Sequence, residues 1–403
     1  MSGILSYVLG TDGESQAIQV PPVEIHHVET DPDRRARSLK HLLKANHVNY
    51  SVVYSQLRFD NHNAHILSSA YLLGATPNQL HDIYEDQAKE LEPWTPSPAE
   101  LMDEDWMDYM GDAWYQRAYL DYYEDKLAME YAYDWKKLVE HFLFSSKKPL
   151  VHGLICGLGH PLIQLAYAYE MDSKEIATEA LTLASVHQNF LYDYSSKPSL
   201  TKKSSMASQS ILDLLREMSE DKELDGLPKD MEFRYLEGIF AKNKGVVMKY
   251  WNAWDTSDPL TAFQTSQQAA VALFVTSVDS SARDYSFFFV HLLTTSHAVR
   301  ILLPLFPARH QISLMRQWWL LVIAVYIFKG RPRLAPENVD EHLGGRDWKY
   351  VQHKALDSPY SKDAHYVKAI RAMREAARTW GDDDEYYLRA AATFVDNFHG
   401  WTF

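Results

Sequence analysis

Apolar side chains recur at helical spacing along most of this chain, so the hydrophobic pattern predicts helices. In the first half, such runs occupy residues 33–50, 61–75, 76–91, 126–144, 160–171 and 173–194. Thr76 precedes Pro77, a pair typical of a helix N-terminus, and Ser173 is placed to cap a run that carries Glu175 and Glu179 in its first turns. No alternation of apolar and polar residues is long enough to predict a strand.

The second half is more apolar and again helical in its pattern. Its runs occupy residues 263–280, 285–306, 313–328, 360–380 and 382–398. The most apolar window, 318–328, is too short to cross a bilayer and predicts a buried helix. A polar stretch near 194–207 is the best candidate for a linker between two helical halves. We therefore expect a single domain over residues 1–403, folded as an all-α, multi-helix globular array.

Composition and charge narrow the function classes. The chain has 403 residues, of which 46% are hydrophobic and 13% aromatic, enough for a large buried interior. The formal net charge is −14 and no basic stripe occurs, which argues against a nucleic-acid partner. The N-terminal segment lacks a basic start, so we expect a soluble, cytoplasmic protein with no signal peptide and no membrane partner. No glycine-rich phosphate loop is present, which counts against a built-in Rossmann domain.

The cysteine and histidine content restricts the kind of metal site. Cys156 is the only cysteine, so neither a disulfide framework nor a thiolate-bound cluster forms within the chain. Any metal must be held by nitrogen and oxygen ligands, which makes the 18 histidines the residues to examine. Apolar helical runs carry His62, His65, His160, His291 and His365, with His187 as a less polarised case.

These histidines have two interpretations. A single histidine on an apolar helix face is more often a hydrogen-bonded core residue than a ligand. Several buried imidazoles, however, cost free energy unless each finds a partner, and one shared metal ion satisfies many of them together. His62 and His65 are about one helical turn apart and share a face. The spacing therefore favours a metal site between helices and leaves the metal unidentified.

Lys368 stands three residues after His365 and so lies on the same helix face. One interpretation is a surface lysine whose stem covers apolar neighbours. The functional interpretation requires burial, which lowers the pKa of a lysine and leaves a neutral amine. A neutral amine binds carbon dioxide as a carbamate and becomes, in effect, a carboxylate ligand.

Four groups of residues, taken in chain order, resemble the motifs of one known family. They are NHNAHILSSAYLLGATPNQL, GLGHPLIQLAYAYE with ASVHQN behind it, DYSFFFVHLLTTS, and DAHYVKAIRA. They extend from about residue 50 to about residue 375, so the likeness covers most of the chain. On these motifs the chain resembles the questin-oxidase-like family of fungal enzymes that tailor aromatic polyketides.

The resemblance implies an oxidoreductase that cleaves a carbon–carbon bond of an anthraquinone-type aromatic polyketide, a small-molecule substrate, in secondary-metabolite biosynthesis. Family members are described as NADPH-dependent Baeyer–Villiger-type monooxygenases. One branch looks instead like a non-haem iron dioxygenase that uses Fe(II) with O₂ and holds its metal with histidines and a carboxylated lysine. We take the iron-dependent oxygenase as the leading hypothesis and the NADPH-dependent enzyme as its alternative.

The same resemblance implies particular site residues. Lys368 matches the carboxylated lysine, and His365 matches a histidine that is either a ligand or a catalytic neighbour of the ligands. The implied metal ligands are His62, His65, His160, His291 and Lys368, and which member of the His62 and His65 pair binds is open.

Gln164 departs from the family pattern, which usually places a histidine four residues after the HP histidine. Three consequences remain open: Gln164 coordinates through its amide oxygen, it hydrogen-bonds a bound water, or it marks a loss of activity. His152 is a candidate to compensate, against the simpler interpretation that it only precedes the helix. Loss of activity leads to a third hypothesis, a catalytically degenerate polyketide-binding protein. The sequence leaves the substrate, the bond cleaved and the oligomeric state undetermined.

Overall fold

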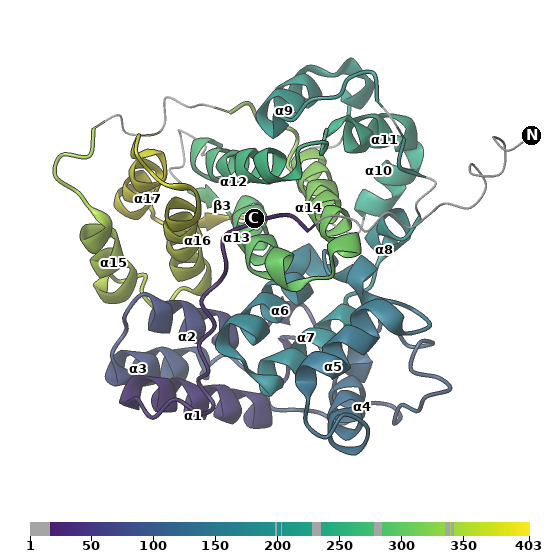
Figure 1. The fold of residues 1–403 in the computed structure, drawn as a ribbon, viewed down its shortest axis with the longest axis vertical. Helices are drawn as coiled ribbons and strands as arrows, with labels where there is room; N and C mark the ends of the chain where they lie inside the picture. Colours follow the sequence, from purple (N-terminus) through teal and green to yellow (C-terminus); the bar gives the residue numbers. More distant parts are fainter. Residues whose placement is uncertain are drawn as a thin grey trace, which may run out of the picture.

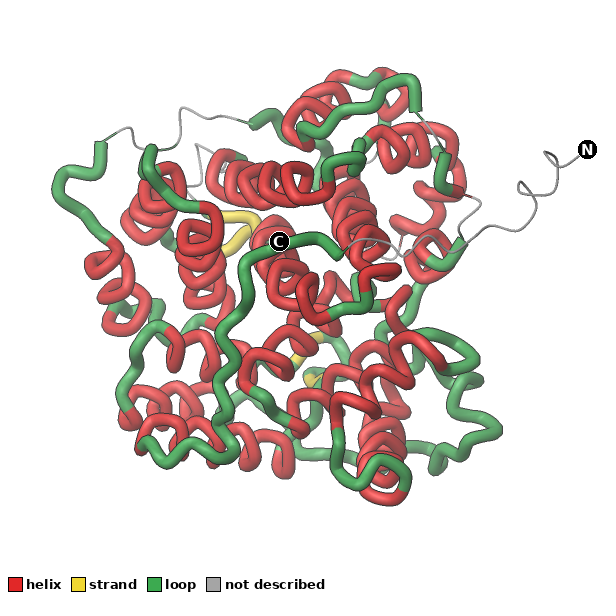
Figure 2. Tube along the Cα trace, viewed as in Figure 1, coloured by secondary structure: helices red, strands yellow, loops and turns green. Residues whose placement is uncertain are grey.

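The structure is a computed structural model that describes residues 17–197, 200–202, 204–227, 235–277, 284–334, 339 and 342–403. Within these residues it contains seventeen α-helices and four strands of two residues each. Figures 1 and 2 show helices packed on helices, with the strands as minor elements. The predicted all-α fold is confirmed.

The helices of the first half follow the predicted runs closely. They are α1 (Arg34–Asn49), α2 (Asn63–Leu72), α3 (Pro77–Gln87), α4 (Gln116–Met129), α5 (Trp135–Glu140), α6 (His160–Met171), α7 (Lys174–Val186) and α8 (Phe190–Ser195). Thr76 and Gln79 form a capping box at the start of α3, with Pro77 in its first turn. Ser173 caps α7 by accepting a hydrogen bond from the Ile176 amide. Both predicted helix starts are therefore confirmed.

The second half contains longer and more apolar helices. They are α9 (Ile211–Glu220), α10 (Leu236–Lys242), α11 (Lys244–Ala253), α12 (Pro259–Thr276), α13 (Phe287–Leu302), α14 (Ala308–Phe328), α15 (Trp348–Asp357), α16 (Ala364–Trp380) and α17 (Tyr386–Asn397). The last three residues of the predicted run 263–280 lie outside the described residues. The window 318–328 lies in α14 and is buried, as predicted.

Two predicted runs are not continuous helices. The run 173–194 is divided into α7 and α8, which are separated by residues 187–189, and the run 126–144 is divided as well. α4 ends at Met129, and the left-handed backbone of Ala132 (φ 48°) and Tyr133 (φ 65°) turns the chain. Asp134 then starts α5 by accepting a hydrogen bond from the Lys137 amide. Helical spacing of apolar residues persists across this turn, so the pattern alone does not reveal it.

Four helices form a ring at the centre of the molecule (Figure 1). α2 and α13 each pack against both α6 and α16. Outside the ring, α1 and α3 cover α2, α7 covers α6, α12 and α14 cover α13, and α15 and α17 cover α16. The apolar faces of these outer helices bury most of the ring.

Two pairs of strands fix loops beside the ring. β1 (Val53–Tyr54) pairs antiparallel with β2 (Phe59–Asp60), directly before α2. β3 (Tyr285–Ser286) pairs in parallel with β4 (Trp401–Thr402) and so holds the C-terminal segment against the first turn of α13.

Two segments, Phe287–Leu305 and Ala308–Phe328, are long and apolar enough to cross a membrane by length and composition. In each, 83% of the most apolar window is buried inside the protein, as in the core helices of a globular fold. The linker near 194–207 includes residues outside the described part, so the boundary between two halves stays a prediction. α6 and α13, which lie on either side of this stretch, pack against each other.

Gly159 gives a test of how the ring is held together. Its φ of +80° is left-handed, and a Cβ atom there would overlap the Thr295 side chain on α13. We expect Gly159→Ala to lower the free energy of unfolding by roughly 2–4 kcal/mol, from backbone strain and overpacking. Chemical denaturation measures this loss. Gly238→Ala is the control, because Gly238 lies in α10 with open space around it, and no loss is expected there.

Candidate metal centre

Four histidines converge where the ring helices begin. His62 precedes α2, His160 is the first residue of α6, His291 lies in the second turn of α13, and His365 is the second residue of α16. One ring nitrogen from each lies within 4.8 Å of those of the other three. His160, His291 and His365 are buried, and His62 is partly buried. Together the four residues could hold one metal ion.

Backbone hydrogen bonds fix the tautomers of two of these rings. His160 Nδ1 donates to the Gly157 carbonyl and His291 Nδ1 donates to the Phe287 carbonyl, each at 2.6 Å. Since a carbonyl only accepts, the proton of each neutral ring resides on Nδ1 and a lone pair on Nε2. His62 Nε2 lies 3.0 Å from His160 Nε2, and His365 Nε2 lies 3.3 Å from His291 Nε2. The two lone pairs therefore face into the group, as in metal-binding histidines.

Burial keeps the four rings in the form that binds a metal. It lowers the pKa values of His62, His291 and His365 well below the usual 6.5, and the Lys368 charge lowers each of them further. Burial also lowers the pKa of His160, although the nearby Asp60 carboxylate opposes that shift. Neutral imidazoles are the protonation state that a metal ion requires.

Asp60 is a site residue that the sequence analysis missed. Its carboxylate accepts a hydrogen bond from His187 Nε2 and lies 3.3 Å from His160 Nδ1. Burial raises the pKa of Asp60, but His160 and His187 outweigh burial and lower it to about 2. A buried carboxylate therefore stands behind His160, where it orients a ligand ring. Its place two residues before His62 was the available signal.

Lys368 is buried behind the histidine group. Only 1% of the residue is exposed, so the surface-lysine interpretation was wrong. Its Nζ lies 3.4 Å from His65 Nδ1. Burial lowers the pKa of Lys368 to about 7, although Asp363 and Asp60 oppose the shift. A substantial fraction of the side chain is consequently a neutral amine near neutral pH.

His65 belongs to the same layer as Lys368 and not to the converging group. Its ring stacks on Tyr167 with centroids 5.2 Å apart and lies 6.3 Å from the His160 ring. His65 Nε2 is buried and has no hydrogen-bond partner among the described residues. The structure thus brings His62 into the group and leaves His65 beside Lys368.

Gln164 contacts His65 and begins a buried chain that leads away from the four converging histidines. Its Nε2 donates to Glu179 Oε2 at 2.6 Å, and Glu179 Oε1 lies 2.9 Å from His47 Nδ1. His47 Nε2 lies 2.7 Å from the partly exposed Glu124 carboxylate. Burial lowers the pKa of His47, but Glu124 and Glu179 outweigh burial and raise it to about 10. Gln164 therefore links the layer of His65 to a charged network near the surface.

His152 and His187, the remaining histidines considered from sequence, occupy different places. His152 packs edge-on against Tyr192 and is not part of the converging group. His187 hydrogen-bonds Asp60, and its ring centroid lies 6.5 Å from that of His160. His187 therefore supports Asp60, and His152 does not stand in for a missing ligand.

Aromatic side chains border one side of the group. The Phe287 ring lies 4.6 Å from His365 and 4.7 Å from His291, measured between centroids. Phe287 also contacts Phe403 at 4.7 Å, and Trp401 lies 5.9 Å from His365. Phe403 is 73% exposed, so this aromatic border reaches from the buried histidines to solvent.

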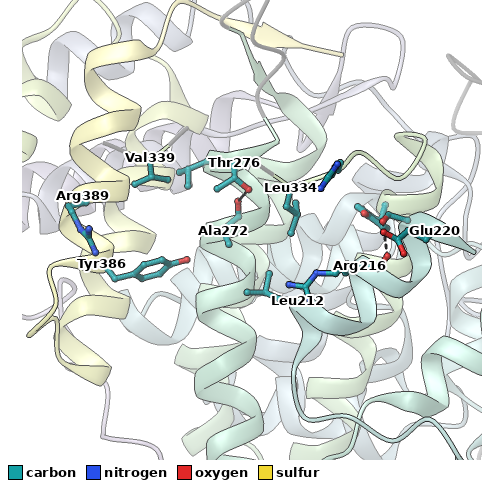
Figure 3. Close-up of a pocket in the computed structure, with 13 residues that line it drawn as sticks. Leu212, Arg216, Glu220, Ala272, Thr276, Leu334, Val339, Tyr386 and Arg389 are labelled. Atoms are coloured by element: carbon teal, nitrogen blue, oxygen red, sulfur yellow. Dashed lines mark hydrogen bonds between the residues drawn. The ribbon is translucent and has the colours of Figure 1, made fainter. Parts of the chain in front are cut away.

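A separate cavity of about 570 Å³ lies between α9, α12 and α17 (Figure 3). Tyr386 and Arg389 of α17 lie across it from Leu212 and Arg216 of α9. Arg333 adds a third arginine to its lining. No lining residue comes from α2, α6, α13 or α16, so this cavity is distinct from the histidine group.

Comparisons with known proteins agree with the motifs. A family model described as "Questin oxidase-like" matches residues 59–373, which span the whole histidine group. A Baeyer–Villiger oxidase of Emericella nidulans is 24% identical over 400 residues, covering 90% of this chain and 87% of that protein. A Baeyer–Villiger oxidase of Pestalotiopsis microspora is 24% identical over 381 residues, covering 85% and 82%. Questin oxidase of Aspergillus terreus is 21% identical over 380 residues, covering 87% and 82%.

The network around His47 predicts a pH-dependent contribution to stability. The folded-state pKa of about 10 lies above the ordinary 6.5, so this contribution is complete below about pH 6.5 and is lost as the pH rises toward 10. We expect His47→Gln to cost roughly 2–4 kcal/mol of unfolding free energy at pH 6, because it leaves the buried Glu179 carboxylate without a positively charged partner.

Urea unfolding at pH 6, 8 and 9.5 checks this expectation. The difference between the parent and His47→Gln should shrink steadily as the pH rises. His81→Gln, an exposed substitution on α3, serves as the control and should change little at any pH. A difference for His47→Gln that stays constant from pH 6 to 9.5 would contradict the assignment.

Proposed function

The chain belongs to the questin oxidase-like family and is an oxidoreductase, and we propose that it is an iron(II)-dependent oxygenase. Its proposed reaction opens a ring of an anthraquinone-type aromatic polyketide during secondary-metabolite biosynthesis. One observation carries the iron requirement: four neutral imidazoles converge, and two of them have their lone pairs directed inward by backbone carbonyls.

The donor set fits this metal. His62, His160, His291 and His365 would hold the ion, and nitrogen ligands of this kind suit iron. Iron(II), when bound, would supply the activation of O₂ that an oxidative ring opening requires. Asp60 holds His160 through its Nδ1 side, and its own orientation is set by His187.

Lys368 is the proposed source of an anionic ligand. A neutral amine and carbon dioxide combine to give a carbamate and one proton, so the side chain gains a carboxylate without a change of residue. His65 Nδ1 lies where it accepts a hydrogen bond from Lys368 Nζ, whose nitrogen keeps one hydrogen in the carbamate. The negative charge would lie close to the N-terminal ends of α2, α6 and α16, where helix dipoles favour it.

The aromatic border supports a flat substrate. Phe287, Trp401 and Phe403 offer ring faces beside His291 and His365, and planar polycyclic phenols stack well on such surfaces. Phe403 would contact the substrate at the exposed end of this border, so the side chains bind and orient the ring system while the buried end excludes water.

A second candidate is an NADPH-dependent Baeyer–Villiger monooxygenase acting on the same substrate class. Two observations favour it: relatives named Baeyer–Villiger oxidases, and the cavity of Figure 3, whose three arginines suit a phosphate-bearing cofactor. Turnover that requires NADPH and survives removal of metal by a chelator would favour this enzyme over the iron-dependent one.

Metal content provides the first test of the iron proposal. We expect near-stoichiometric iron in the parent protein and at least ~10-fold less in His160→Ala and Lys368→Ala, because each loses a ligand. Plasma mass spectrometry of purified protein measures it. Lys362→Ala, at an exposed lysine just before α16, is the matched control and should keep its iron. Stoichiometric zinc without iron, or no metal in the parent, would overturn the proposal.

The carbamate has its own readout. After exchange into ¹³C-bicarbonate, the parent should give a carbamate carbon signal by NMR that Lys368→Ala lacks. Two results together would contradict this role: Lys368→Ala keeps all its iron, and the parent gives no carbamate signal. Lys368 would then not be a ligand, and the four histidines would be the only proposed ligands.

Gln164→His tests whether the departure at this position weakens the site. Gln164 donates to Glu179, so we expect the substitution to alter iron content by less than about twofold, since no ligand is added to the converging group. Iron content and polyketide turnover, measured together, separate the hypotheses. A large rise in iron would mean that Gln164 occupies a ligand position, and full iron with no turnover in either protein would favour the degenerate binding protein.

A further inference from the structure

A second polar cavity lies further along the same four helices. Its volume is about 350 Å³, and it is lined by residues of α2, α6, α13 and α16 together with the segment 21–26. None of the converging histidines lines it. Arg371 follows His365 by six residues, which is about 9 Å along α16. The four helices meet at the histidines and again at this cavity, so they run parallel.

Unpartnered buried groups face each other in this region. Among the described residues, both ring nitrogens of His297 lack a hydrogen-bond partner, and so do Nε and Nη1 of Arg371 and Oε2 of Glu170. These residues are 7%, 1% and 5% exposed respectively. A buried polar atom without a partner costs about 1–3 kcal/mol, so three such side chains lining one cavity indicate an occupant that hydrogen-bonds to them.

The charges of the cavity floor favour an anion. Arg300 and Arg371 are buried there. Arg371 Nη2 donates a hydrogen bond to Oε1 of Glu170. Three arginines and three glutamates line the cavity. Burial raises the pKa of Glu170 to about 7 against the opposing effect of Arg371, so near neutral pH the arginines outweigh the glutamates in charge. Glu24 and Glu375 line the same cavity; Glu375 pairs with Arg378 at 3.1 Å, and its carboxylate also acts on Arg300 and Arg371.

The walls favour an organic rather than an inorganic anion. Leu72, Pro21, Pro22 and Val23 add apolar surface to the lining. A cavity of roughly 150 Å³ accommodates benzene, so this larger one has room for an aromatic ring together with a charged substituent.

We propose that this cavity binds a small aromatic carboxylate, with its carboxylate group on Arg300 and Arg371 and a hydrogen bond from His297. The site is separate from the metal centre, with Tyr167 between them: the His65 ring stacks on Tyr167 at 5.2 Å, and the Arg371 guanidinium lies 5.4 Å from the centroid of that ring. Binding here needs no metal and does not depend on the proposed reaction.

Isothermal titration of the full chain with benzoate tests the proposal. We expect saturable 1:1 binding of benzoate and at least ~10-fold weaker binding of benzamide, which has the same shape without the charge. Arg300→Gln should weaken benzoate binding about tenfold, and Glu170→Gln should tighten it by a few-fold because it removes the competing negative charge. Weaker binding by Arg300→Gln could also come from misfolding, but tighter binding by Glu170→Gln could not. The Glu170→Gln variant therefore separates the two explanations.

A control variant excludes the other arginine-lined cavity. Arg389→Gln changes the cavity of Figure 3 and should leave benzoate affinity unchanged. The proposal is overturned if the parent does not bind benzoate, if benzamide binds equally well, or if Arg389→Gln abolishes binding while Arg300→Gln has no effect.

Discussion

Two backbone hydrogen bonds orient the rings of His160 and His291. Each ring donates from Nδ1, His160 to the Gly157 carbonyl and His291 to the Phe287 carbonyl, so the Nε2 lone pairs of both rings point into the converging group. Lone pairs gathered in a dry interior repel one another, and their desolvation opposes folding. A metal cation placed between the lone pairs would attract each of them, which would turn this repulsion into a net attraction. The histidines remain close because the outer helices pack around them, so the hydrophobic core stabilises a polar centre that would be unfavourable by itself.

The parallel arrangement of α2, α6, α13 and α16 explains the size of the fold. Short loops join antiparallel neighbours, whereas parallel helices need long connections that return to the same end. Here α3–α5, α7–α12 and α14–α15 form those returns, and the same helices cover the ring. Because α2, α6 and α16 begin at the histidines, their dipoles add positive potential there. The buried Asp60 carboxylate is a negative charge that balances this potential.

Much of the fold and part of the site could be predicted from local patterns. Helical spacing, the capping residues Thr76 and Ser173, and the apolar surroundings of His160 and His291 are local features, and the structure agrees with them. Asp60 was missed because it is linked to His187 across the fold, over 127 positions in sequence. The turn at Ala132 was missed because backbone conformation leaves no trace in the apolar periodicity. Whether His62 or His65 joins the group depends on the orientation of the first turn of α2, which no spacing rule decides.

Gln164 shows how a departure from a family pattern can change a buried network while the four converging histidines stay together. A histidine there would face the Glu179 carboxylate, which already pairs with His47. Protonated, it would place another positive charge in the layer of His65 and Lys368, where positive charge already lowers the pKa of every neighbouring imidazole. The amide of Gln164 keeps the hydrogen bond to Glu179 and adds no charge. Burial lowers the pKa of His65 and the side-chain amide of Gln164 opposes that shift, so this one amide connects the layer of His65 and Lys368 to the Glu179 carboxylate.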